Sequence, residues 1–163
     1  YLYRKGFPMA ALMKDDVRIL RKLQEDGRVT NAALAEELGM SASPCWRRGR
    51  QLEDDGSIKG YSADLDRRRI GLGVLVYVVI QIDKHSDEDA TRFEEEISAL
   101  PEVVSCHSVS GGADFILMVV SRDLDSYAEF SMTTLRRLPG IKTMTTNFAL
   151  KEIKPFQGFP LEL

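Results

Sequence analysis

The side chains best suited to chemistry in this sequence are three arginines that fall within four positions of one another, Arg47, Arg48 and Arg50. A guanidinium group can bond two acceptors on the edge of a guanine, or it can clamp a phosphate. Arginine at this density in a short segment is typical of a surface that meets a polyanion. The alternative is the solvated face of a structural helix, and the elements around the arginines must decide between the two.

The net charge of −3 is unevenly distributed along the 163 residues. Residues 1–68 hold 13 Lys and Arg against 11 Asp and Glu, whereas residues 69–163 hold 9 against 14. The positive excess therefore lies in the half that carries the arginines. A second basic group, residues 67–69, stands at the boundary between the two halves.

Apolar residues at helical spacing predict three short helices in the first third of the chain. The first ends at Asp26-Gly27, the second is capped by Thr30 and ends at Gly39, and the third is capped by Ser41 and closes at Asp55-Gly56. The residues expected to face inward are Val17, Leu20, Leu23, Leu34, Ala35, Leu38, Cys45 and Leu52.

The second and third of these helices carry the pattern of a helix-turn-helix. Ala35 is small where the two helices must cross closely, and Gly39 supplies the backbone angles of the turn. The residues opposite the inward face of the third helix are expected to enter a major groove, and they are Ser43, Trp46, Arg47 and Arg50. We expect Arg48 to position the helix on the phosphate backbone. Trp46 has two interpretations: it lies on the duplex backbone, or it shields the small core near Gly49.

The second half of the chain contains the same strand-helix-strand pattern twice. A strand at 74–82, a helix and a strand at 103–109 are followed by a strand at 115–120, a helix and a strand at 141–150, and both helices end at a Leu-Pro pair. The residues expected to face inward from the two helices are Ala90, Phe93, Ile97 and Leu100, then Leu124, Tyr127, Phe130 and Leu135. Two tandem βαβ units predict a ferredoxin-like βαββαβ sandwich with both helices on one face of four antiparallel strands.

The opening strand of that sandwich, Val74 to Ile80, is apolar on both of its alternating faces. The sheet face without helices is therefore not expected to stay in contact with water. Burying several such side chains at about 1.5 to 3 kcal/mol each would drive pairing with a second copy of the chain. The sequence predicts a homodimer through this sheet.

The expected organisation is thus an α+β chain of two domains. Residues 1–11 are a flexible arm or a non-native remnant, 12–66 a three-helix, winged helix-turn-helix domain, 67–73 a linker, 74–155 the ferredoxin-like dimerisation and ligand-sensing domain, and 156–163 a tail. Within the first domain, residues 58–65 alternate and can form a strand or wing. No apolar run approaches the roughly 20 residues of a membrane span.

Several short motifs resemble the leucine-responsive/asparagine-operon (Lrp/AsnC) family of transcription regulators. In the first half they are residues 34–41, Ser43-Pro44-Cys45, Arg47-Arg48, Leu52-Glu53 and Gly56-Ser57-Ile58. In the second half they are Leu100-Pro101-Glu102-Val103, residues 109–115, Leu138-Pro139-Gly140-Ile141 and residues 150–154. The resemblance covers about residues 12–155, and no single motif carries it.

The resemblance implies an amino-acid-responsive regulator that binds double-stranded DNA, dimerises through its sheet and assembles further into tetramers or octamers. It places an effector site at Ser108, Ser110, Gly111, Gly112, Asp114 and Thr146. The residues themselves permit two interpretations of the loop: its glycines and Asp114 receive the carboxylate and ammonium of an amino acid, or it is an ordinary hairpin with a solvated Asp. Ala113 and Met144 depart from the family's usual residues at their positions.

Catalysis and metal binding are not expected. The two histidines, His85 and His107, have no sequence partner for acid-base or nucleophilic work, and no Cys/His spacing suggests a metal site. We expect no catalytic residue and no cofactor other than an amino-acid effector. Cys45 and Cys106 fall in different domains, which favours reduced thiols and a cytoplasmic location.

A second function remains open, because Gly49 interrupts the third helix and the acidic run Glu53-Asp54-Asp55 follows the arginines. Glycine inside a helix costs about 1 kcal/mol relative to alanine. The alternative is a small-molecule-binding ferredoxin-like oligomer whose DNA-binding domain is degenerate.

Overall fold

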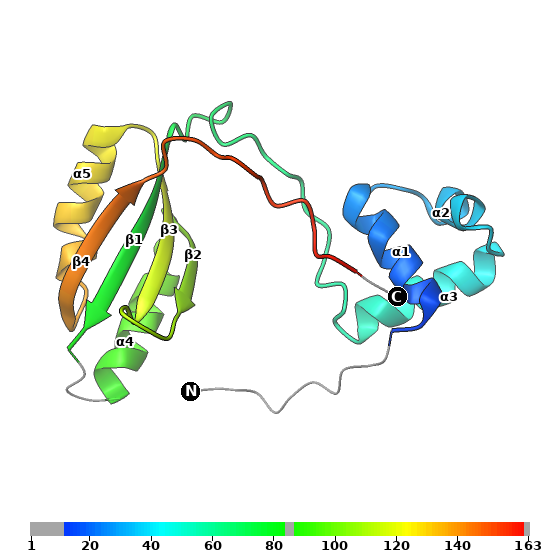
Figure 1. Ribbon diagram of the computed structural model, residues 1–163, viewed down its shortest axis with the longest axis horizontal. Coiled ribbons are helices and arrows are strands. Elements are labelled where there is room, and N and C mark those ends of the chain that lie inside the picture. The colour runs from blue at the N-terminus through cyan, green and yellow to red at the C-terminus, as the bar shows by residue number, and fades with distance from the viewer. Residues whose placement is uncertain (1–11, 84–86, 162–163) are drawn as a thin grey trace. The chain divides into compact units, whose positions relative to one another are not determined.

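A computed structural model describes residues 12–83 and 87–161 of the chain (Figure 1). Contacts divide the chain into two compact units: one comprises the residues through Asp64 together with those from Lys154 on, and the other is Leu65–Ile153. The N-terminal arm, His85 and the environment of Ala90 lie outside what is described. No helix in the described ranges is long and apolar enough to cross a membrane.

The first unit contains three helices, α1 (Lys14–Glu25), α2 (Asn31–Leu38) and α3 (Ala42–Asp54). Thr30 caps α2 as predicted, because its hydroxyl accepts a hydrogen bond from the Ala33 N–H at 3.2 Å. Gly39 ends α2 with a φ of +63°, a left-handed conformation that favours glycine, and so lets the Met40 N–H bond to the Ala35 carbonyl at 2.8 Å. The expected helix-turn-helix is confirmed.

The core of this unit differs in detail from the expected one. Its buried members are Ile19, Leu34, Ala35, Cys45 and Leu52. Ile19 is fully buried and was not among the predicted positions, whereas Leu20 and Leu23 are only partly buried around it. The inward stripe of α1 is therefore centred one residue earlier than the apolar spacing suggested.

Residues 58–65 form no strand, so the expected wing strand is wrong. Ile58 packs against the helical core and donates its N–H to the Leu52 carbonyl at 2.8 Å, and residues 59–65 have no regular secondary structure. The alternating pattern cannot produce a strand here because the described part of this unit offers no second strand to pair with.

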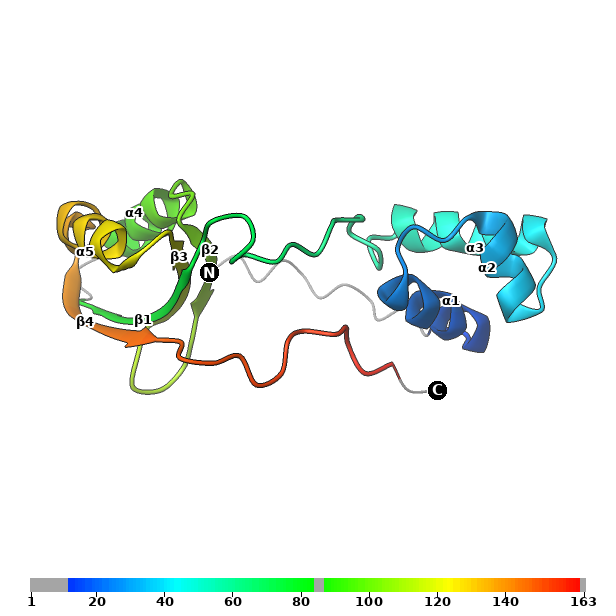
Figure 2. The same ribbon diagram turned by 90° about the horizontal axis from the view of Figure 1, so that it is seen from above.

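The second unit is a four-stranded antiparallel sheet carrying two helices. Its elements are β1 (Val74–Ile82), α4 (Asp87–Ser98), β2 (Val103–Ser108), β3 (Phe115–Ser121), α5 (Leu124–Thr133), a 3-10 turn at Leu135–Arg137 and β4 (Ile141–Phe148). The strands lie in the order β2-β3-β1-β4. Figure 2 shows α4 and α5 together on one face of the sheet, which confirms the ferredoxin-like arrangement.

The core of the second unit lies between this sheet face and the helices. Alternate residues of β1, from Val76 to Ile82, pack with Phe93, whose ring centroid lies 4.7 Å from that of Phe115. Leu124 was expected to face inward but is 60% exposed, because it occupies the first turn of α5 just after the capping residue Asp123. β4 ends at Phe148, two residues before the predicted end, and only Ala149 still bonds to β1.

Candidate nucleic-acid interface and effector loop

The rotation of α3 about its axis is set by two buried side chains, Cys45 and Leu52, which are 0% and 3% exposed. Burial raises the pKa of the Cys45 thiol, which therefore stays neutral in the core. The opposite side of α3 carries the predicted contact residues Ser43, Trp46, Arg47 and Arg50, and all four are exposed. The structure thus brings these four residues together on one helix face.

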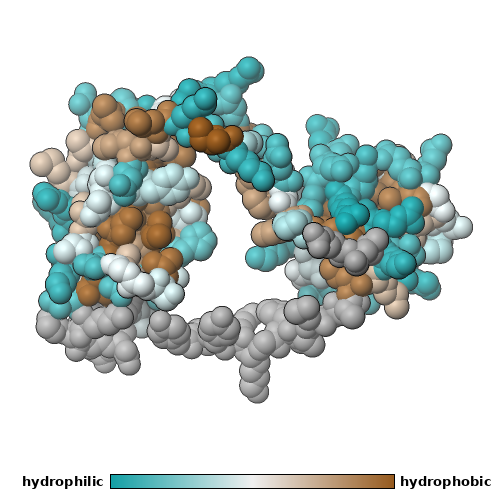
Figure 3. Space-filling view, viewed as in Figure 1, coloured by the Kyte–Doolittle hydropathy of each residue, from teal (hydrophilic) through white to brown (hydrophobic). Residues whose placement is uncertain are grey.

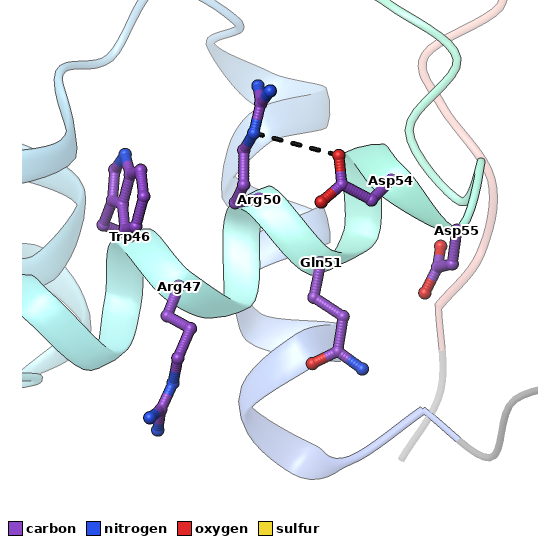
Figure 4. Close-up of a pocket in the computed structure, with 6 residues that line it drawn as sticks. All are labelled: Trp46, Arg47, Arg50, Gln51, Asp54 and Asp55. Carbon is purple, nitrogen blue, oxygen red and sulfur yellow. Dashed lines mark ion pairs between the residues drawn. The ribbon is translucent and has the colours of Figure 1, made fainter.

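Arg47 is the arginine most available to a ligand on this face. It is exposed and forms no ion pair with any residue in the described ranges. Figure 4 shows Arg47 and Gln51 projecting from the same side of α3, four residues apart. Gln51 was not among the contact residues expected from the sequence. Its spacing of four from Arg47 places both residues on one helix face, and an exposed amide can donate to and accept from a base edge.

Trp46 is 55% exposed and takes no part in the helical core. A Cβ atom built on Gly49 meets no other group within 4 Å, so the region beside Gly49 is open. The interpretation in which Trp46 shields the core near Gly49 is therefore wrong. The exposed ring on the arginine face is therefore free to contact an external partner.

Arg48 points in a different direction from Arg47. Its guanidinium bonds to the Asp16 carboxylate of α1 at 2.8 Å, and the two side chains are 26% and 15% exposed. A second guanidinium nitrogen lies 3.2 Å from the Met13 sulfur. Arg48 therefore joins α3 to α1, and a phosphate at the position expected from sequence would have to compete with Asp16 for this guanidinium.

Arg50 is exposed but already paired along its own helix. It lies 3.0 Å from the Glu53 carboxylate. It also lies 3.8 Å from the carboxylate of Asp54, the ion pair that Figure 4 marks with a dashed line. Hydrogen bonds from the side chain and backbone of Ser57 lower the pKa of Asp55, which therefore stays ionised at the end of α3. A phosphate near Arg50 would have to compete with these carboxylates, whereas Arg47 pairs with no carboxylate of the described residues.

The first turn of α3 remains open to an anion. Ser41 stands at the N-cap but its side chain makes no capping bond, contrary to the expectation. Pro44 has no N–H to satisfy. The first-turn N–H groups of α3, which include that of the exposed Ser43, therefore stand in the position where helices often hold phosphate.

The loop between β2 and β3 is held to the middle of the sheet by side chains. Gln81 of β1 donates its side-chain N–H to the Gly112 carbonyl at 2.5 Å and accepts from the Thr143 hydroxyl of β4 at 2.9 Å. Asp114 accepts from the Ile82 backbone N–H at 3.0 Å. Gly111 has a φ of +122°, which explains why glycine stands there.

The structure brings Ser108, Ser110, Gly111, Gly112 and Asp114 together in this loop but places Thr146 elsewhere. The Thr146 hydroxyl lies 2.9 Å from the Tyr127 hydroxyl, between β4 and α5. Thr143, three residues earlier on β4, donates its hydroxyl to the Gln81 side chain, which in turn bonds to Gly112 of the loop. Sequence reasoning missed Gln81 and Thr143, because pairing between strands so far apart in sequence leaves no local signal.

Alanine substitution of the two adjacent arginines should affect the stability of the first unit very differently. We predict that Arg48→Ala lowers the free energy of unfolding of the first unit by about 1 to 3 kcal/mol, because it leaves the half-buried Asp16 without its charged partner. The matched change Arg47→Ala should stay within about 0.5 kcal/mol. Urea denaturation followed by circular dichroism measures both, and equal losses would contradict the assigned orientation of α3.

Comparisons with known proteins cover both units. A family model described as a winged helix-turn-helix DNA-binding domain matches residues 16–59, and the Lrp/AsnC ligand binding domain matches residues 75–159. The Bkd operon transcriptional regulator of Pseudomonas aeruginosa is 40% identical over 153 residues, which is 94% of this chain and 100% of that protein.

Solved structures agree with these matches. A transcriptional regulator from Neisseria meningitidis, determined as a complex with L-methionine, has a TM-score of 0.88 at 36% identity, covering 92% of this chain and 97% of the other. An AsnC family transcriptional regulator from Agrobacterium tumefaciens has a TM-score of 0.86 at 38% identity, covering 91% and 97%. With both units matched in the same order over nearly their full length, the chain belongs to the Lrp/AsnC family, whose members are DNA-binding transcriptional regulators and not enzymes.

Proposed function

We propose that this regulator reads double-stranded DNA with the exposed face of α3, acts as a homodimer joined through its open sheet face, and responds to an amino acid at the loop 108–114. The observation that carries the proposal is Arg47, an exposed arginine without an ion pair in the described ranges, on a helix whose rotation is fixed by buried side chains. Because its ligand would be chromosomal DNA, we place the protein in the cytoplasm.

On a duplex, some residues of this face would contact bases and others would contact the sugar-phosphate backbone. Arg47 presents a planar fork that fits the O6 and N7 acceptors of guanine, and Gln51 presents an amide that fits adenine. Ser43 and the first-turn N–H groups of α3 would hold phosphate, with the exposed ring of Trp46 lying against the sugar-phosphate backbone. Specificity is therefore assigned to Arg47 and positioning to the start of α3.

The DNA-reading role predicts a specific defect in Arg47→Ala. On duplexes selected by the wild-type protein from a random library, the variant should lose about tenfold or more in affinity, because one good two-bond contact to a base is worth about 1 to 3 kcal/mol. On duplexes of unrelated sequence, the same variant should lose less affinity. Fluorescence anisotropy measures both, with Arg28→Ala, which removes an exposed charge beyond the end of α1, as the control.

The same titrations, repeated over a range of salt, separate the two candidate functions. Wild-type affinity should fall steeply with salt, and Arg47→Ala should reduce that slope. Salt-insensitive binding, or a selection that yields no preferred sequence, would favour the alternative of a small-molecule-binding oligomer with a degenerate DNA-binding domain.

The homodimer is proposed from the sheet face opposite α4 and α5. At the centre of this face Tyr77 of β1 pairs with Met118 of β3, and Val79 pairs with Ile116. Tyr77 is 42% exposed and Ile116 36% exposed, although both belong to the middle strands of the sheet. Figure 3 shows apolar side chains, in brown, gathered on the second unit in this view.

A second copy of the chain is the occupant that we propose for this face. An isologous interface would bury the same apolar centre from both copies, and polar β4 residues such as Thr145 and Asn147 would form its rim. Dimerisation would also supply two α3 helices, as recognition of two successive half-sites requires. Further assembly of dimers into tetramers or octamers is what the family resemblance implies.

A charge at the centre of this face should dissociate the dimer. We expect Tyr77→Lys to sediment as a monomer at concentrations where the wild type is a dimer, because a buried lysine without a partner is costly at an apolar interface. Met132→Lys, which adds the same charge to a 64% exposed position of α5, is the control. A Tyr77→Lys protein that remains dimeric would place the interface elsewhere.

The effector is proposed to be an amino acid bound at the loop 108–114. The exposed Gly111 and Gly112 can turn backbone N–H groups toward a carboxylate, and Asp114 adds a negative charge for an ammonium group. The related regulator from Neisseria meningitidis was solved with L-methionine. Because Gln81 and Asp114 join the loop to β1, a ligand there would act directly on the strand at the centre of the proposed dimer.

Replacing Asp114 with asparagine separates its charge from its structural bond. Asp114→Asn removes the charge but keeps an oxygen that can accept from the Ile82 N–H. In a melting screen against the common amino acids, an effector at about 100 times its dissociation constant should stabilise the wild type by roughly 2.7 kcal/mol. The variant should lose this stabilisation, whereas Asp125→Asn should keep it. A variant that responds as the wild type does to every amino acid would show that the site is misplaced.

A further inference from the structure

We propose that the C-terminal segment 154–161, here called the strap, is a working part of the DNA-binding unit: it docks on α1 and limits the freedom of the head, defined as the helices α1 to α3. Although these residues follow the last strand of the sensor sheet, their contacts group them with the helices. The inference goes beyond DNA reading but rests on the proposed binding of one duplex by two heads.

The strap is held to α1 through its backbone. Gln24 donates its side-chain N–H to the Phe159 carbonyl at 3.1 Å and accepts from the Phe159 N–H at 2.6 Å. This reciprocal pair imitates one rung of an antiparallel sheet. One turn earlier on α1, Arg21 donates two guanidinium N–H groups to the Leu161 carbonyl, one of them from Nε at 2.8 Å.

The sequence of the strap suits this docking. Gly158 has a φ of +99°, and a Cβ atom there would lie 2.8 Å from the Gln24 side-chain oxygen. Only glycine therefore lets the chain approach Gln24 closely enough for both bonds to Phe159. On either side of this glycine, the rings of Phe156 and Phe159 pack edge to face with centroids 5.2 Å apart. These contacts give the strap a defined conformation, which distinguishes it from an unattached C-terminal tail.

α1 in turn holds the recognition helix. Its Asp16 carries the ion pair to Arg48 of α3, and its Ile19 lies in the helical core with Cys45. The strap therefore acts on α3 through a helix that packs rigidly against it. The strap thus contacts Gln24 of α1, and α1 contacts α3, the helix that carries Arg47.

The consequence is a second tether between the two units. Without docking, the head would be joined to the sheet only by the linker that precedes β1, whereas docking at Phe159 closes a loop from the end of β4. A closed loop restricts the positions that a head can sample. In a dimer, this restriction raises the effective concentration of the second head at its half-site once the first head has bound.

The test releases the strap in the full-length protein. In wild type, the Phe159 amide should exchange slowly with deuterium, and in Gln24→Ala it should exchange freely. On a selected duplex with two half-sites, Gln24→Ala should lose about tenfold in affinity, whereas on the same duplex cut to one half-site the loss should stay below about twofold. Glu25→Ala, which removes the adjacent exposed side chain that pairs with Lys22, is the matched control, and Gly158→Ala should reproduce Gln24→Ala.

Each outcome decides a separate point. Rapid exchange of the Phe159 amide in wild type would overturn the docking itself, whether or not DNA binds. Protection of that amide, combined with equal losses on both duplexes or with no loss, would overturn the tethering role. If no duplex is bound at all, the proposed DNA function fails and the tethering role fails with it, while the exchange data still report on docking.

Discussion

The close packing of α3 against α1 and α2 is the constraint on which the candidate DNA interface depends. Ala35 and Cys45 are small enough for the helices to approach, and Leu52 with Ile19 fills the remaining space. Successive residues of a helix point about 100° apart. Once Cys45 faces the core, Arg47 must face solvent and Arg48 must face α1, so two chemically identical neighbours lie in different environments.

The same logic of periodicity governs the sensor unit with a period of two. Val76, Val78 and Ile80 face the helices, so Tyr77 and Val79 must face the other way, and β1 carries apolar residues on both faces. A strand of this kind is stable only between two covers. The helices α4 and α5 supply one, and a second copy is the cover proposed for the other. Gln81 and Asp114 then connect this strand to the loop assigned to the effector.

Local sequence patterns predicted the elements whose causes are local. Thr30 and Gly39 bound α2, the Leu-Pro pairs follow the two sensor helices, and alternation gives β1 and β3 nearly to the residue. The exposed face of α3 was predicted for the same reason, because Cys45 and Leu52 define its opposite side.

Features that depend on distant partners could not be predicted in this way. Asp16 meets Arg48 across 32 positions, and Gln24 meets Phe159 across 135, so neither contact leaves a periodic trace. The wing strand failed because alternation alone does not supply a pairing partner. Leu124 failed because a helix-forming pattern does not mark which residue takes the exposed first turn.

The most direct test of the account uses Trp46, the only tryptophan of the chain, as a reporter on the arginine face of α3. Its fluorescence quenching by acrylamide can be measured with and without a selected duplex. The account predicts that the 55% exposed ring is readily quenched in the free protein and becomes strongly protected when the duplex binds. Quenching that stays unchanged in a fully formed complex would contradict the assignment of this face to DNA.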